Sequence, residues 1–326
     1  MSKILFLAPD LTDPTSFYRC GGIAHDLENK SGHEITTIQW NQIPISWQIL
    51  SNFDLVMLQR PFTKVAADLC QYIKIFGLPL WVDYDDNLFC LNPENKAFHT
   101  YNNLETQENI KNCLKIADAV SVPTEYLRQA YSTYSKNIFV IPNAFNDGIF
   151  KRVELKKRDN KVIWRGPESH IYDLMTFGKE INRFCEGFPE WNFLFIGFYP
   201  WFLSKTQNKE FMPGLDIIMY FNKLFDLAPA ILHVPLHDNT FNRCRSDVAF
   251  LESTWAGAIT ITPSWWNLPG TLPYTDTASY YESMRSLLAG EINVEVENRI
   301  AWEYIYDCRR LSKINVLRLE LINSLK

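Results

Sequence analysis

Short apolar runs alternate with stretches of helical spacing along most of the chain. Six runs in the first half are rich in β-branched and aromatic residues, which is typical of strands. They are residues 3–9, 33–40, 54–61, 79–85, 119–123 and 138–143. Between several of them the apolar residues recur at helical intervals, as in "TKVAADLCQYIKIFG" and "NIKNCLKIADA". Alternating strands and helices predict a parallel sheet joined by right-handed crossovers.

A second series of the same kind follows a lysine-rich stretch. Its predicted strands are residues 161–166, 192–198, 230–236 and 258–263. The final stretch has helical spacing without a strand signal, and we expect it to fold back over the domain junction. The predicted fold class is therefore α/β, with two Rossmann-like doubly wound domains that face a cleft. The predicted boundaries are 1–145 and 146–295 for the two domains and 296–326 for a C-terminal helix that crosses back.

Composition places the chain among globular proteins. Hydrophobic residues make up 47% of its 326 residues and aromatic residues 14%, enough for two buried cores. No apolar run reaches the ~18 residues of a membrane span, and no secretory signal pattern is present, so we expect no membrane span and a cytoplasmic protein. The 7 cysteines form no C-x-x-C pair, which argues against a zinc site and a disulfide framework.

The charge distribution gives little reason to expect a general affinity for nucleic acid. The formal net charge is -5, although "FKRVELKKRDNKVIWR" at residues 150–165 is locally basic. A charge run of this kind is either a solvated linker or a track that binds phosphate. Both interpretations remain open at this stage.

In doubly wound sheets, ligands bind beyond the carboxyl ends of the strands, so the loops after the strands matter most. The first of these loops, "APDLTDPTSFYRCGG", lacks the G-x-G-x-x-G spacing that seats a dinucleotide. A nicotinamide oxidoreductase is therefore only a weak alternative. Gly21 and Gly22 open a predicted helix whose amides could receive an anion beside Arg19. A glycine turn with a surface arginine is the equally simple interpretation.

The stretch "FNRCRSDVAFLESTWAGAITITP", residues 241–263, combines arginines and one glutamate with a helix that leads into a strand. Ser246 suits a helix start, and the spacing of Arg245 and Glu252 is nearly two turns, which predicts that they share a helix face. A phosphate at the helix start would meet Arg243 and Arg245, while Glu252 accepts hydrogen bonds from sugar hydroxyls. The alternative is a glutamate and an arginine that simply pair.

This stretch resembles the donor-binding segment of nucleotide-sugar glycosyltransferases of the GT-B type, in the broad family 4-like group of bacterial and phage enzymes. Further phrases agree in their order and in their positions at strand ends. They are "SFYR", "LQRP", "WVDYDDNLF", "ADAVSVPTEYL", "VIPNAF" and "VIWRGPESHIYDL". The resemblance covers most of residues 1–290 and implies the GT-B fold, with an acceptor-side first domain and a second domain that binds the nucleotide sugar.

The resemblance also implies roles for individual residues. Glu252 would hold the ribose hydroxyls of the donor, and Arg165 and Arg245 would neutralise its diphosphate without a bound metal. One position departs from the family pattern, because Cys244 stands where a first glutamate is usual; Asp238 or Asn239 could substitute for it. The expected donor-binding set is Arg165, Gly166, His170, Asp238, Asn242, Arg243, Arg245 and Glu252. Arg19, Gly21 and Gly22 are expected on the phosphate or acceptor side.

The acidic stretch "DYDD" supports two interpretations. It could be a metal-binding D-x-D, since paired carboxylates suit Mg²⁺ or Mn²⁺. In a GT-B cleft, Asp85 and Asp86 would instead be catalytic residues that orient the acceptor hydroxyl or stabilise positive charge at the sugar. A third interpretation is that they only cap the following loop. Trp265 and Trp266, after the last predicted strand, could form a flat wall for a sugar or a base, although such residues more often pack in a core.

The sequence thus predicts a glycosyltransferase, a hexosyl- or pentosyltransferase, that uses a nucleotide diphosphate sugar as co-substrate. We expect no metal and no tightly bound cofactor. The acceptor is left open, with a hydroxymethylated base in phage DNA among the candidates. The alternatives are a noncatalytic module that binds nucleotide sugars and the Rossmann oxidoreductase. Closure of the cleft around the donor is expected, with a hinge near residues 143–147.

Overall fold

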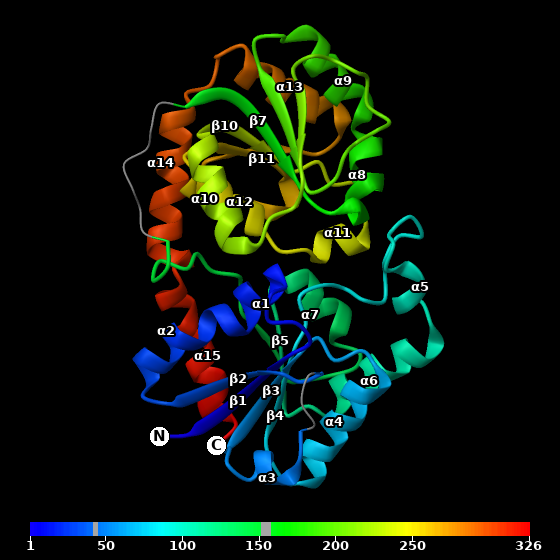
Figure 1. Ribbon diagram of the computed structural model, residues 1–326, viewed down its shortest axis with the longest axis vertical. Helices are drawn as coiled ribbons and strands as arrows, with labels where there is room; N and C mark the ends of the chain where they lie inside the picture. The colour runs from blue at the N-terminus through cyan, green and yellow to red at the C-terminus, as the bar shows by residue number, and fades with distance from the viewer. Residues whose placement is uncertain (42–44, 151–157) are drawn as a thin grey trace.

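The computed structural model describes residues 1–41, 45–150 and 158–326. Two α/β domains lie one above the other, and each is built on a six-stranded parallel sheet (Figure 1). Residues 151–157, which carry most of the predicted basic track, lie outside the described part of the chain. Within the described ranges, no helix is long and apolar enough to cross a membrane.

The first domain has the strand order β2-β1-β3-β4-β5-β6. Its strands are β1 (Lys3–Ala8), β2 (Glu34–Gln39), β3 (Leu55–Gln59), β4 (Leu80–Asp83), β5 (Ala119–Val122) and β6 (Ile138–Val140). Its helices are α1 (Pro14–Arg19), α2 (Gly21–Ser31), α3 (Trp47–Leu50), α4 (Lys64–Ile75), α5 (Phe98–Tyr101), α6 (Leu104–Ile116) and α7 (Glu125–Tyr131). All six sequence-predicted strands of this half are present.

Strand β1 shows why these runs are apolar at every position. Leu5 and Leu7 belong to a core cluster with residues of α4 and α6, whereas Ile4 and Phe6 belong to a second cluster with residues of α2 and the C-terminal helix. A parallel sheet that is covered by helices on both faces buries both sides of its strands. The loops at the strand ends therefore carry the polar residues.

The second domain has the strand order β12-β11-β10-β7-β8-β9. Its strands are β7 (Asp159–Arg165), β8 (Asn192–Ile196), β9 (Lys209–Met212), β10 (Pro229–His233), β11 (Ile259–Pro263) and β12 (Thr271–Tyr274). Its helices are α8 (Ile171–Thr176), α9 (Gly178–Gly187), α10 (Ile217–Leu227), α11 (Thr240–Cys244), α12 (Val248–Trp255), α13 (Thr277–Leu288) and α14 (Val294–Tyr304), with the short turns η1 (Glu168–His170) and η2 (Ser264–Trp266). The sequence analysis did not predict the edge strands β9 and β12.

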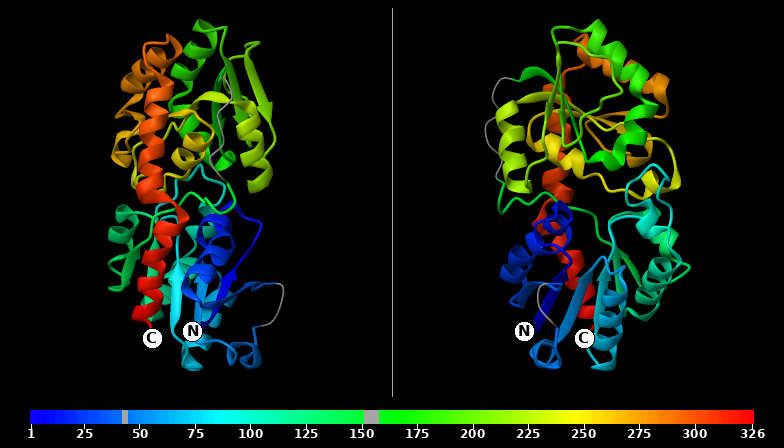
Figure 2. Two further views of the ribbon diagram at one scale, coloured as in Figure 1. Left: turned by 90° about the vertical axis from the view of Figure 1, so that its left-hand side faces the viewer. Right: turned by 45° about the vertical axis from the view of Figure 1, so that its right-hand side comes forward.

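The chain returns to the first domain through a π-helical turn, Ile305–Arg309, and ends in α15 (Leu311–Ser324), which packs beside α2. Figure 2 shows α14 and α15 running along both domains. The outgoing and returning segments are joined at the crossing, because the backbone N–H of Phe145 donates to the carbonyl of Arg309 at 2.8 Å and that of Leu311 donates to the carbonyl of Phe145 at 2.8 Å. The C-terminal segment is thus two helices, and the crossing lies between them.

Candidate functional site between the two domains

The carboxyl ends of the two sheets face each other across a cavity of about 150 Å³. Helix α1 after β1 and the loops after β4 and β6 supply one wall, and the end of β7, the α11–α12 connection and α12 supply the other. The lining residues are Pro14, Thr15, Tyr18, Arg19, Asp85, Asp86 and Asn143 from the first domain and Arg165, Arg245, Ser246, Val248 and Glu252 from the second. This is the position at which doubly wound folds bind ligands.

Glu252 links the two domains across this cavity. It lies on α12 and is only 2% exposed. Its Oε2 accepts from the Nε of Arg165 at 2.8 Å and from the hydroxyl of Tyr220 at 3.2 Å, and its Oε1 accepts from the hydroxyl of Tyr18 at 3.0 Å. The sequence analysis left open that Glu252 simply pairs with an arginine; it does, but the arginine is Arg165 and not Arg245. Tyr18 comes from α1, so this cluster joins the two domains.

Arg165 is the last residue of β7 and has one end of its guanidinium committed to Glu252. Its Nη2 is enclosed and has no hydrogen-bond partner within the described ranges. Burial disfavours the charge, but the carboxylate of Glu252 outweighs it and holds the pKa of Arg165 above the ordinary value. An arginine with an unsatisfied, enclosed nitrogen is suited to bind an anion, since leaving such a donor unpaired costs about 1–3 kcal/mol.

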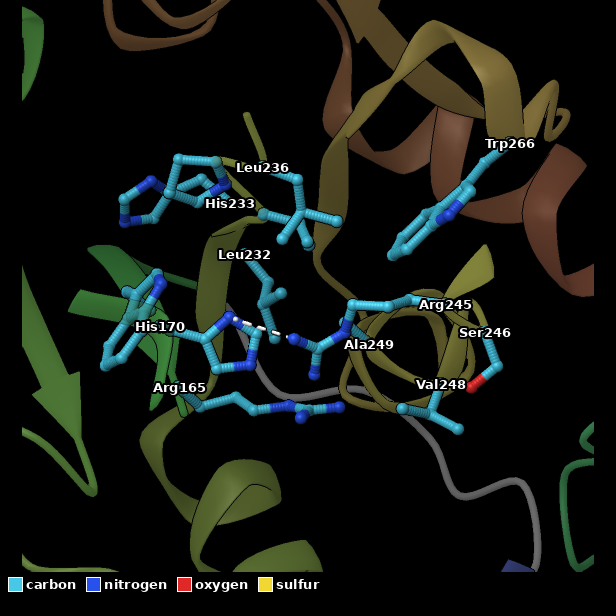
Figure 3. A pocket seen from close by; sticks show the side chains of 13 residues that line it. Arg165, His170, Leu232, His233, Leu236, Arg245, Ser246, Val248, Ala249 and Trp266 are labelled. Carbon is cyan, nitrogen blue, oxygen red and sulfur yellow. Dashed lines mark hydrogen bonds between the residues drawn. The ribbon is translucent and has the colours of Figure 1, made fainter. Parts of the chain in front are cut away.

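Arg245 approaches the same place from a different element. It forms the C-terminal cap of α11, and α12 begins only at Val248, so the predicted shared helix face with Glu252 is wrong. The two residues meet because they line one cavity. Nη1 of Arg245 lies 3.4 Å from Nδ1 of His170 (Figure 3). No carboxylate in the described part of the chain forms an ion pair with Arg245.

His170 completes this nitrogen-rich corner. It ends the turn η1 and is 8% exposed. Burial and the adjacent Arg245 lower its pKa to about 4, despite a contact with Asp173, so the imidazole is neutral at neutral pH. Arg165, His170 and Arg245 together line a further small pocket of about 40 Å³. Two positive charges and a neutral imidazole converge here, which favours a multiply charged anion.

A larger cavity of about 440 Å³ opens beside Glu252. Besides Arg165 and Glu252, its lining includes Gly166, Pro167, Ile196, Gly197, Gly214, Leu215, Ile217 and Tyr220. Gly197 has φ +97°, and a Cβ there would lie 2.6 Å from the carbonyl oxygen of Gly166. The ends of β7 and β8 thus approach closely only because Gly197 lacks a side chain, whereas a Cβ on Gly166 would meet the rings of His170 and Trp164 at 3.0 Å.

The two predicted catalytic carboxylates have different environments. Asp85 forms a bidentate ion pair with Arg60, whose Nε donates to Oδ1 at 2.7 Å. Burial opposes the charge of Asp85, but Arg60 outweighs it and lowers the pKa of that carboxyl. The pKa of Asp86, in contrast, is raised by burial and by the neighbouring Asp85. No side chain of the described residues donates a hydrogen bond to the carboxylate of Asp86, so of the two it is the one available to a ligand.

Arg60, the partner of Asp85, has an unusual backbone conformation. Its φ is 46°, in the left-handed region, which few residues other than glycine adopt. The following residue is Pro61, and the strand β3 has just ended. A conformation of this kind costs on the order of 1–3 kcal/mol and is found most often at functional sites.

The expected phosphate-side residues of the first domain have structural partners. Arg19 is 2% exposed and pairs with Asp83, through Nε at 3.0 Å and Nη2 at 2.6 Å. Gly22 is required by packing, since a Cβ there would lie 2.2 Å from the carbonyl oxygen of Phe17. Neither Gly21 nor Gly22 is among the residues that line the interdomain cavity. The simpler interpretation, a glycine turn, describes these two residues, but Arg19 is buried and not on the surface.

The polar residues around α11 mostly form hydrogen bonds and ion pairs that stabilise this segment. Asp238 and Arg243 form an ion pair at 2.6 Å, and the side chain of Asn239 caps α11 by accepting from the N–H of Asn242 at 2.8 Å. The amide of Asn242 is buried and donates to Asp173 at 2.7 Å and to a backbone carbonyl. Cys244 is 2% exposed at the domain contact. None of these five residues lines the interdomain cavity.

Tyr18, Tyr220 and Arg60 are the residues at this site that sequence reasoning did not assign. Tyr18 and Arg60 stand inside the phrases "SFYR" and "LQRP", which follow the first and third strands, so their position at strand ends was a usable signal. Tyr220 lies in a helix, α10, with no such signal. Among the described residues, no group of three or more His, Cys, Asp or Glu side chains could hold a metal ion.

Comparison with known proteins shows which solved structures share this architecture. No protein-family model matches the chain, and no curated protein sequence matches it. Solved structures do: an α-glucosyltransferase in complex with UDP and a 13-mer DNA containing an HMU base has a TM-score of 0.69 at 12% identity, with 99% of each chain covered. The Anabaena protein HepE, in complex with UDP, has a TM-score of 0.66 at 12% identity and covers 99% of this chain and 100% of its own.

A third similar structure belongs to a different activity. The UDP-GlcNAc 2-epimerase from Neisseria meningitidis, bound to UDP-GlcNAc, has a TM-score of 0.55 at 11% identity and covers 99% of this chain and 100% of its own. These likenesses establish the fold class: the chain has the two-domain GT-B fold that nucleotide-sugar glycosyltransferases and epimerases share. The expected α/β fold class is confirmed.

Proposed function

We propose that this protein is a glycosyltransferase that moves a sugar from a nucleoside diphosphate to an acceptor hydroxyl. One observation carries the proposal: Arg165 at the end of β7 and Arg245 after α11 converge on a cavity whose opposite wall holds Asp86, whose carboxyl has no side-chain donor among the described residues. A diphosphate needs fixed cations, and an acceptor hydroxyl needs a hydrogen-bond acceptor. Both lie in one interdomain cavity at the carboxyl ends of the sheets.

The donor is arranged along the second domain in this proposal. Its base and ribose occupy the 440 Å³ cavity beside Gly166 and Gly197, and the ribose hydroxyls donate to Glu252. Among the described residues, Tyr18 alone donates to Oε1 of Glu252, and a carboxylate oxygen has capacity for another hydrogen bond. The diphosphate then lies at Arg165, Arg245 and the neutral His170. His170 is neutral because burial and Arg245 lower its pKa to about 4, but its ring can still donate one hydrogen bond to a phosphate oxygen.

The chemistry follows from the charges. The bond between the anomeric carbon and the diphosphate oxygen breaks, the acceptor oxygen bonds to that carbon, and the acceptor hydroxyl loses its proton. Negative charge grows on the departing diphosphate, where preorganised cations stabilise the transition state by several kcal/mol. Asp86 orients the acceptor hydroxyl and receives its proton, and its raised pKa makes it a stronger base than an ordinary aspartate. Asp85, paired with Arg60, positions this loop.

Two arginines at the diphosphate replace a divalent cation in this mechanism. The alternative of a metal at Asp83 and Asp85 has weaker support, because Asp83 is engaged by Arg19 and by the hydroxyl of Ser121, and Asp85 is engaged by Arg60. Carboxylates that are already neutralised by arginines are poor candidates for binding Mg²⁺ or Mn²⁺.

The test is a turnover assay with a panel of nucleotide sugars, in which liquid chromatography and mass spectrometry follow the donor, the free nucleoside diphosphate and the product. The acceptor panel holds methyl glycosides, oligosaccharides and an oligonucleotide with a hydroxymethylated pyrimidine, the last because one similar structure contains such DNA. We expect nucleoside diphosphate release that depends on an acceptor and is lost in Arg245→Ala. The surface variant Arg285→Ala, which removes an arginine of exposed ion pairs, should keep it.

Two results would contradict the proposal. Conversion of UDP-GlcNAc to its 2-epimer without an acceptor would indicate the epimerase activity named for one of the similar structures. Tight binding of a nucleotide sugar without turnover under any acceptor would indicate a noncatalytic binding module.

A further inference from the structure

A second interdomain pocket, of about 230 Å³, lies next to the arginine site and has no role in the donor arrangement. We call it the aromatic groove and define it by Tyr126, Arg243, Arg245, Trp265 and Trp266. Tyr126 comes from α7 of the first domain, whereas both tryptophans come from η2 of the second. Arg245 and Trp266 line this groove and the small pocket at His170 as well, so the groove adjoins the proposed diphosphate position.

Aromatic rings and one arginine dominate the aromatic groove. The guanidinium of Arg243 lies 5.9 Å from the ring centre of Tyr126 and 5.7 Å from that of Trp265. Asp238 accepts two hydrogen bonds from it, of 2.6 and 2.8 Å, in an ion pair that is partly exposed. The Nε1 atoms of Trp265 and Trp266 are enclosed and have no acceptor within the described ranges. Two unpaired indole donors in one turn are costly wherever they are buried.

The charges of the groove are compensated by neighbouring groups. Arg243 is paired with Asp238 and Arg309 with Asp247 at 2.7 Å, while Glu125 is paired with Arg128. Arg243, Arg245 and Arg309 all line the pocket, and of these three only Arg245 has no carboxylate partner among the described residues; in the proposed function it binds the diphosphate. A strand of nucleic acid needs free cations along its phosphates, and the net charge of the protein is -5. The groove therefore favours an uncharged occupant.

We propose that the aromatic groove binds a sugar residue of an uncharged carbohydrate acceptor. A pyranose ring presents apolar C–H faces to aromatic rings, and its hydroxyl oxygens accept hydrogen bonds at its rim. Such a residue, stacked on Trp265 and Tyr126, would direct a hydroxyl past Arg245 toward the cavity that holds Asp86. This inference rests on the proposed function and specifies its acceptor.

The test compares four variants of the full chain. Trp265→Ala removes one wall, Trp265→Phe keeps a flat ring, and Tyr126→Ala removes the wall contributed by the other domain. Trp201→Ala is the matched control, because Trp201 is 66% exposed and does not line the groove. Each variant is titrated with methyl glycosides of glucose, galactose, mannose and N-acetylglucosamine, and separately with an oligonucleotide that carries a hydroxymethylated pyrimidine, in the presence of saturating UDP, by saturation-transfer NMR. Thermal melts establish that each variant is folded.

We expect at least one methyl glycoside to bind, with an affinity that falls about tenfold, or about 1.4 kcal/mol, in Trp265→Ala and Tyr126→Ala. Trp265→Phe and Trp201→Ala should stay within about twofold, and the affinity for UDP should not change in any of the four. If no glycoside binds while UDP does, or if an oligonucleotide is the ligand that Trp265→Ala weakens, the carbohydrate assignment is overturned and the proposed function stands. If neither UDP nor any other nucleoside diphosphate binds, the proposed function fails as well.

Discussion

Replacing Glu252 by alanine should weaken both the fold and the donor site. The carboxylate accepts three hydrogen bonds, from Tyr18, Arg165 and Tyr220. The Glu252 side chain is 3% exposed and that of Arg165 is 23% exposed. The substitution therefore leaves two tyrosine hydroxyls and one largely buried guanidinium without their acceptor, in a domain whose core is otherwise unchanged.

The magnitude follows from the burial of the pair. Breaking a buried ion pair by removing one partner costs about 3–5 kcal/mol, and the partial exposure of Arg165 favours the lower end. At about 2–4 °C per kcal/mol for a domain of this size, a loss of about 3 kcal/mol lowers the melting temperature of the second domain by about 6–12 °C. A domain with a typical stability of about 5–15 kcal/mol tolerates this and stays folded at 25 °C.

Two measurements check this prediction. Scanning calorimetry gives the change in melting temperature, and isothermal titration at 15 °C gives the affinity for UDP, which should fall by about tenfold or more when the ribose loses a charged acceptor. Glu186→Ala is the control, because Glu186 is an exposed glutamate on α9 of the same domain and should change neither quantity. An unchanged melting temperature would refute the buried ion pair, and an unchanged affinity in a folded variant would refute the ribose assignment.

Three further predictions concern the charges around the cavity. The pKa of Asp86 is raised in the folded state, so the stability that its neutral form contributes is present below the unfolded pKa and is lost as the pH rises through the folded value. Asp86→Asn should therefore raise the melting temperature at pH 7 but not at pH 3, and it should abolish transfer. A lowered melting temperature at pH 7 would contradict this. Arg245→Ala should weaken UDP binding by about tenfold or more and reduce its salt dependence, measured by titration at two salt concentrations, with an unchanged affinity as the contrary result. Transfer should survive EDTA, and a loss that Mn²⁺ restores would assign Asp83 and Asp85 as metal ligands.

The fold was largely predictable because its signal is local. Strands buried on both faces must be apolar throughout, and the helices between them carry their own periodicity. The two strands that escaped prediction lie at sheet edges, where this constraint relaxes. In β9, Glu210 and Phe211 are exposed, and β12 contains Pro273, which a central strand would not accommodate. The helix boundary in the C-terminal segment was missed because a π turn keeps the helical spacing.

The site was only partly predictable because its contacts are long-range. Strand-end loops pointed to Asp85, Asp86, Arg165 and the stretch around Arg245, and all of them line one cavity. The pairings could not be derived from spacing, since the hydrogen bond between Tyr18 and Glu252 joins residues 234 positions apart. The predicted helix start near Ser246 was close to that of α12, but Arg245 lies before it in extended conformation, so helical spacing could not relate Arg245 to Glu252.

The start of α12 also has side-chain partners that local spacing does not reveal. Asp247 occupies the N-cap position but makes no capping hydrogen bond with its side chain. Its carboxylate instead pairs with Arg309 from the C-terminal crossing, at 2.7 Å for each oxygen. The side chain of Ser246 accepts from the Nδ2 of Asn143 at 2.9 Å. The predicted hinge near residues 143–147 therefore contacts the loop that carries Arg245, although whether the cleft closes around a donor stays a prediction.

The central claim is that Arg165 and Arg245 form a diphosphate site between the two domains. Isothermal titration of the full chain with uridine, UMP and UDP, repeated with Arg165→Lys and Arg245→Ala, tests it most directly. The account predicts that affinity rises with each added phosphate in the native protein and that this gain is reduced in both variants, while binding of uridine is unchanged in Arg245→Ala. Equal affinity for the three ligands, or a diphosphate gain that both variants retain, would contradict it.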